Sequence, residues 1–73
     1  MAIEWRDVYS TRVERLGYDP ETQEMYVEWK RGRVSVFEGV PDDVAHEASN
    51  AWSVGAFLRI NIEPEYKQRY HDE

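Results

Sequence analysis

The segment EMYVEWK, at residues 24–30, constrains the fold more than any other part of the chain, because its side chains alternate without a break. Met25, Val27 and Trp29 fall on one side of an extended chain, whereas Tyr26 and its charged neighbours fall on the other. Strict alternation of this kind is typical of a β-strand that buries one face. The sequence therefore predicts an antiparallel sheet built around this segment.

A second alternating segment, RVSVFE, follows at residues 33–38, and the loop between the two decides which of its side chains join the core. A three-residue loop with Gly32 in the left-handed conformation places Phe37 beside Met25. A two-residue loop shifts the pairing by one residue and turns the opposite side chains to the core. We favour the longer loop, because the shorter turn prefers Asn or Asp before its glycine and Arg31 stands there.

The remaining elements complete an α+β fold. Residues 12–18 are expected to form the first strand, with a bulge near Arg15 where the alternation fails. A short helix begins around Pro41, and Ser53 is placed to cap a second helix that ends before Pro64. We therefore predict a three-stranded antiparallel meander followed by two short helices packed on one face.

Length and composition limit the class of protein. With 73 residues the chain has room for a single domain with one modest core, and the absence of cysteine excludes disulfides and thiolate metal clusters. No apolar run is long enough to span a bilayer, and the acidic N-terminus does not fit a signal peptide. We expect a soluble cytoplasmic protein whose residues 1–9 and 67–73 are flexible or peripheral.

The chain offers no pattern typical of an enzyme. Its serines lie in turns, a strand or helix caps without a nucleophile elbow, and its four glycines are too scattered for a phosphate loop. Asp42 and His46 are four residues apart on a helix, but nothing supplies the further ligands that a metal site needs. We predict a non-enzymatic protein with no catalytic residue, metal, cofactor, membrane contact or small-molecule substrate.

The tip of the predicted hairpin, at residues 30–33, is strongly basic in a chain whose formal net charge is −6. Arginines close to aromatic rings on a sheet hold unpaired bases in several RNA-binding modules. The competing interpretation is a solvated turn, and the net charge opposes nucleic acid at long range. The candidate nucleic-acid contacts are Arg12, Arg15, Tyr26, Arg31 and Arg33.

Several short motifs occur in the order found in a known family. They are LGYD at 16–19, the apolar positions 25, 27 and 29, Gly32, GVP at 39–41, AWSVGAFL at 51–58, Ile62 and Tyr66. Residues 10–66 thereby resemble the KTSC domain, which is named for its occurrence at the C-terminus of some lysyl-tRNA synthetases and also stands alone in small bacterial and phage proteins. The resemblance implies a small interaction domain, and the synthetase context suggests RNA binding.

The chain departs from the family pattern where RNA binding would matter. Ser35-Val36-Phe37 replaces a central Tyr-x-Tyr, Arg59 replaces an asparagine, and Glu63 replaces a basic residue. We therefore predict a protein partner or self-association, through the acidic surface or the second face of the sheet, with RNA binding as the alternative. The candidate partner contacts on that face are Val34, Val36 and Tyr26.

Overall fold

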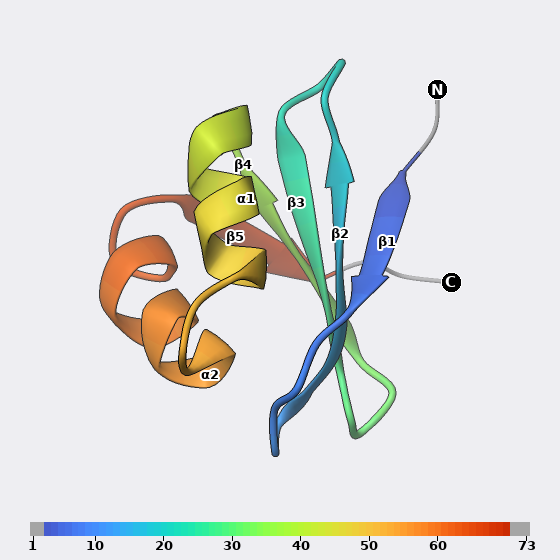
Figure 1. Ribbon diagram of the computed structural model, residues 1–73. Coiled ribbons are helices and arrows are strands. Elements are labelled where there is room, and N and C mark those ends of the chain that lie inside the picture. The colour runs from blue at the N-terminus through green and yellow to red at the C-terminus, as the bar shows by residue number, and fades with distance from the viewer. Residues whose placement is uncertain (1–2, 71–73) are drawn as a thin grey trace.

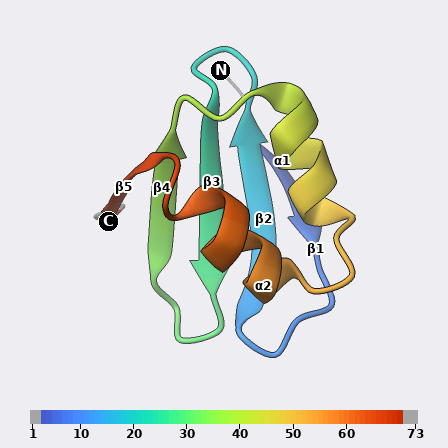
Figure 2. The ribbon, with the colours of Figure 1, turned by 90° about the vertical axis from the view of Figure 1, so that its left-hand side faces the viewer.

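The computed structural model describes residues 3–70 as a five-stranded antiparallel sheet in the order β1-β2-β3-β4-β5. The strands are β1 (Glu4–Asp7), β2 (Val13–Asp19), β3 (Glu24–Trp29), β4 (Val34–Glu38) and β5 (Lys67–Tyr70). The helical elements are α1 (Asp42–Ser49), α2 (Val54–Phe57) and a π-helical turn (Leu58–Ile62) that continues α2. All the helical elements cover one face of the sheet (Figure 1), and Figure 2 shows them lying across the strands.

The predicted α+β class is confirmed, but a meander of three strands undercounts the sheet. β1 and β5 come from the segments that were expected to be flexible or peripheral, and they form its two edges by pairing with β2 and β4. Every side chain of β5 is exposed, and β1 has only one that is partly buried. Because neither strand has a buried face, neither leaves an alternating pattern in the sequence. The outermost parts of those segments, residues 1–2 and 71–73, lie outside the described residues.

The predicted register of the central hairpin is confirmed. The backbone N–H of Trp29 donates to the Arg33 carbonyl at 2.8 Å, and the N–H of Gly32 donates to the Trp29 carbonyl at 2.8 Å. Gly32 has a φ of 95°, in the left-handed region that the three-residue loop requires. Met25 consequently pairs with Phe37, and both side chains are buried.

The core lies between the sheet and the helices. Small residues on α1, Ala45 and Ala48, are buried and let the helix lie close to the strands. Ser53 caps α2 as predicted, since its side chain accepts a hydrogen bond from the Ala56 N–H. Among residues 3–70, no helix combines the length and apolarity needed to cross a membrane. The buried core side chains are Val13, Leu16, Met25, Val27, Phe37, Val40, Ala45, Ala48, Val54, Leu58 and Ile62.

The opposite face of the sheet carries no helix, and we call it the open face. Trp5 of β1 pairs across from Gly17 of β2, and its ring centroid lies 6.0 Å from that of Tyr26. Arg15 places its Cζ 4.2 Å from the centroid of the Trp5 ring, a cation–π contact. Side chains of the sheet itself therefore cover this face in place of a second helical layer.

The close approach of Trp5 to Gly17 predicts a cost for any side chain at position 17. A Cβ there would lie 2.8 Å from Ile3 Cγ2 and 2.9 Å from Trp5 Cε3. Gly17→Ala should lower the free energy of unfolding by about 1–3 kcal/mol, the range for overpacking a filled site. The matched control is Gly55→Ala, where an added Cβ meets nothing within 4 Å. In urea unfolding the control should be neutral or gain up to about 1 kcal/mol, and equal losses in both variants would contradict the contact.

Candidate nucleic-acid interface

Two shallow hollows meet at one end of the sheet, beside the β1–β2 and β3–β4 loops. The first, which we call the hairpin hollow, has a volume of about 730 Å³ and is lined by the tip of the β3–β4 hairpin and by β5. The second, the loop hollow, has a volume of about 670 Å³ and lies between the β1–β2 loop and the start of α2. Both hollows are lined by Thr11, Arg12 and Lys30, so together they form one continuous surface, here called the basic groove.

Cationic side chains dominate the basic groove. The chain has nine Lys and Arg side chains against fifteen acids, yet the described lining of both hollows contains a single acid, Glu63. The local charge is therefore positive although the net charge of the chain is −6. The five cations of the groove are Arg12, Lys30, Arg31, Arg33 and Arg59.

Acidic side chains gather at the opposite end of the sheet. Glu21 lies in the β2–β3 turn, between Asp19 at the end of β2 and Glu24 at the start of β3. Helix α1 begins with Asp42 and Asp43. Figure 1 shows this turn and the start of α1 at the top, and the β3–β4 loop at the bottom. The fold thus gathers these acids away from the groove, while Asp7, Glu14 and Glu28 lie toward the groove end of the strands.

Aromatic rings accompany the cations in both hollows. Trp29 and Tyr70 line the hairpin hollow, and Tyr9 and Trp52 line the loop hollow. Tyr9 and Trp52 are fully exposed, and Tyr70 is 56% exposed. The Arg33 Cζ lies 5.1 Å from the centroid of the Tyr70 ring, which joins a cation of the hairpin tip to the edge strand β5.

Hydrogen bonds to Ser35 hold the wall of the hairpin hollow in place. The Ser35 side chain is buried, and its Oγ accepts hydrogen bonds from Trp29 Nε1 at 2.9 Å and Gln68 Nε2 at 3.1 Å. The same hydroxyl therefore ties the Trp29 indole to β5. This arrangement gives the hollow one fixed ring, that of Trp29, and one mostly exposed ring, that of Tyr70.

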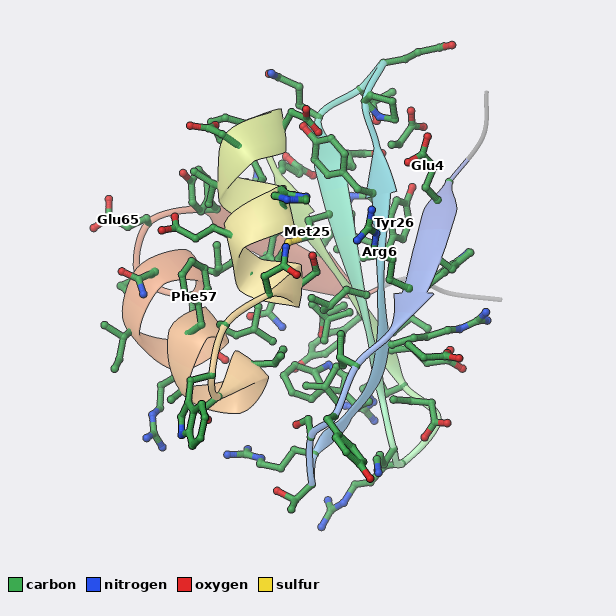
Figure 3. All side chains as sticks on the ribbon, in the orientation of Figure 1. Glu4, Arg6, Met25, Tyr26, Phe57 and Glu65 are labelled. Atoms are coloured by element: carbon green, nitrogen blue, oxygen red, sulfur yellow. The ribbon has the colours of Figure 1, made fainter. Side chains whose placement is uncertain are left out.

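The predicted nucleic-acid contacts do not all come together. Arg12, Arg31 and Arg33 line the basic groove, but Arg15 and Tyr26 lie on the open face. Figure 3 shows Met25 toward α1 and Tyr26 on the other side of the sheet. On the open face Arg15 already has two partners, because it forms an ion pair with Glu28 and a cation–π contact with Trp5. The residues predicted to contact nucleic acid are thus split between two surfaces.

The predicted partner contacts share the open face but are mostly covered. Val36 is 0% exposed and Tyr26 is 7% exposed, while Val34 is partly buried. Arg69 pairs across from Val36 and bridges Glu24 at 2.7 Å and Glu38 at 3.0 Å. A protein contact through this trio stays a prediction, but charged atoms form much of the surface above it.

Sequence reasoning missed the exposed rings of the groove and one of its cations. No spacing connects them, because they come from the β1–β2 loop, the link between α1 and α2, the π-helical turn and the last strand. Trp52 follows the end of α1 at Ser49 and lies in solvent. The missed residues are Tyr9, Trp52, Arg59 and Tyr70.

The fold and the groove together define a small α+β domain that buries one sheet face under helices and carries a basic, aromatic surface at one end. Residues 9–66 match the KTSC domain family. The chain therefore belongs to the KTSC domain family, as the sequence resemblance predicted.

A solved structure has the same fold as the chain. The crystal structure of a KTSC domain protein from Yersinia pestis has a TM-score of 0.90 and covers 97% of this chain and 100% of its own. The two sequences are 24% identical, so the likeness shows the fold alone. No curated protein matches the chain.

The ion pairs of Arg69 predict an acid-dependent loss of stability. The hydrogen bond from Arg69 holds the pKa of Glu24 below its ordinary value of 4.5, although burial opposes this. The unfolded chain therefore binds more protons than the folded one just below pH 4.5, and the stabilisation is lost as the pH falls through the lowered pKa.

Arg69→Gln should accordingly lower the free energy of unfolding at pH 7. The difference in this free energy between the variant and wild type should become smaller toward pH 3. Urea unfolding at a series of pH values measures both effects. Lys67→Gln, on the same strand and with no ion pair among residues 3–70, is the matched control. A difference between wild type and Arg69→Gln that stays constant with pH would contradict the role of Glu24.

Proposed function

We propose that this KTSC domain is a non-enzymatic module that binds single-stranded nucleic acid in the basic groove, which takes up the RNA binding predicted from sequence as the alternative to a protein partner. One observation carries the proposal: five of the nine cations of an acidic protein line one surface together with four aromatic side chains. Cations attract the phosphates of a strand, and exposed rings offer stacking surfaces to its bases.

The shape of the groove favours a single strand. Unpaired bases can turn toward protein rings, whereas the bases of a duplex are already stacked on one another. The rings of Tyr9, Trp52 and Tyr70 project from loops and an edge strand, where a flexible strand can reach them. Tolerance of many base sequences is expected, since every base has a face that can stack.

A protein partner on the open face has less support. The apolar side chains proposed for that contact, Val36 and Tyr26, are buried, and Arg69 with its two carboxylates lies across them. Burial of an apolar patch would be the expected driving force for such a contact. The basic groove, in contrast, exposes both charge and aromatic surface.

Charge reversal at the hairpin tip should weaken binding. The double variant Arg31→Glu and Arg33→Glu is expected to bind a strand of about ten nucleotides at least roughly tenfold more weakly at low salt. If both arginines contact phosphates, the slope of log affinity against log salt concentration should decrease in magnitude by about 1.4. Fluorescence anisotropy with labelled oligo(U) measures both quantities.

The matched control reverses two cations that lie outside the groove, Arg6 and Lys67, and so produces the same net charge. This variant should bind far more tightly than the hairpin variant. An equal loss of affinity in the two variants would mean that binding depends on the total charge and not on the groove, which would contradict the proposal.

The three tryptophans report where the strand binds. Trp29 lines the hairpin hollow, Trp52 lines the loop hollow, and Trp5 lies on the open face. In an NMR titration of labelled protein with oligo(U), the indole N–H signal of Trp29 should shift while that of Trp5 stays in place. A shift confined to Trp5 would place binding on the open face and overturn the proposed site.

A further inference from the structure

Trp52 and Tyr9 leave their entire rings in water. Both are fully exposed, and they line the same loop hollow from separate segments, the α1–α2 link and the β1–β2 loop. A folded domain gains little from two such rings, because neither is removed from water in the isolated molecule. Because both line one hollow, they offer a stacking surface to a ligand that brings an apolar, planar group.

The other side chains of the loop hollow point to an anion. Arg12, Lys30 and Arg59 line it, and its described lining contains no acid. A ligand that suits both the rings and the cations has a planar ring system attached to a negative group. A nucleotide unit has these two parts, a base and a phosphate.

We infer that the loop hollow is a base-binding subsite, in which Trp52 and Tyr9 stack on an unpaired base of the bound strand. This inference rests on the proposed function and specifies it further. Arg12 and Lys30 belong to both hollows. A phosphate held at this shared wall leaves its nucleotide next to the loop hollow, while the strand continues into the hairpin hollow.

The volume of the loop hollow agrees with this occupant. It is about 670 Å³, within the range of roughly 300–1,000 Å³ that is usual for small-ligand sites. Its continuity with the hairpin hollow favours a polymer over a free nucleotide, because one strand can use both hollows at once. The rings of the loop hollow then contact bases, whereas the arginines of the hairpin tip contact only phosphates.

The test compares two strands that differ only in their bases. One is oligo(U) of about ten nucleotides, and the other is an abasic strand of the same length and charge. Wild type should prefer oligo(U) by roughly tenfold, the effect expected for stacking on an aromatic ring. Trp52→Ala and Tyr9→Ala should each reduce this preference and leave the salt dependence unchanged, and Trp52→Phe should retain part of it.

Ile60→Ala is the matched control, because Ile60 is 65% exposed and lies outside the described lining of both hollows. It should keep the full preference for oligo(U). Thermal unfolding should show that all four variants fold as wild type does, since each altered side chain is exposed.

The outcomes separate the subsite from the proposed function. If Trp52→Ala and Tyr9→Ala keep the wild-type preference while reversal of Arg31 and Arg33 still weakens binding, the subsite is wrong and the proposed function stands. If wild type binds neither strand at low salt, both are overturned, and the two rings are left as a surface for a protein partner.

Discussion

Gly32 adopts a left-handed conformation at the tip of the central hairpin, and this conformation fixes how β4 pairs with β3. A shift of the pairing by one residue would turn every side chain of β4 to the opposite face. In the observed register Phe37 enters the core and the Ser35 hydroxyl reaches Trp29. β5 then builds on β4, so that Gln68 also reaches Ser35 and one wall of the groove is complete. The core and the candidate site thus depend on the same turn.

The parts of the fold that could be predicted from sequence are those that bury one face. β3 and β4 alternate because Met25 and Phe37 pack under the helices while Tyr26 and Val36 lie on the open face. The irregularity near Arg15 was visible as a break in that alternation, and the pairing shifts between Val13 and Arg15. β1 and β5 could not be found this way, since edge strands with exposed side chains are held by backbone hydrogen bonds, which carry no residue pattern.

The candidate site could be predicted only where its residues are close in sequence. The cations of the hairpin tip were identified because they flank one turn, and Arg12 was identified as their neighbour. Arg15 was placed with them wrongly: the bulge after Val13 turns it to the open face, where Glu28 and Trp5 occupy it. The exposed rings come from segments that only the tertiary fold brings together, so the aromatic half of the groove has no local signal.

The gathering of five cations on one surface changes what the net charge of −6 means for a ligand. The molecule measures 28 × 26 × 21 Å, whereas the electrostatic screening length at physiological ionic strength is about 8 Å. A ligand at the groove is therefore largely insulated from the carboxylates at the far end.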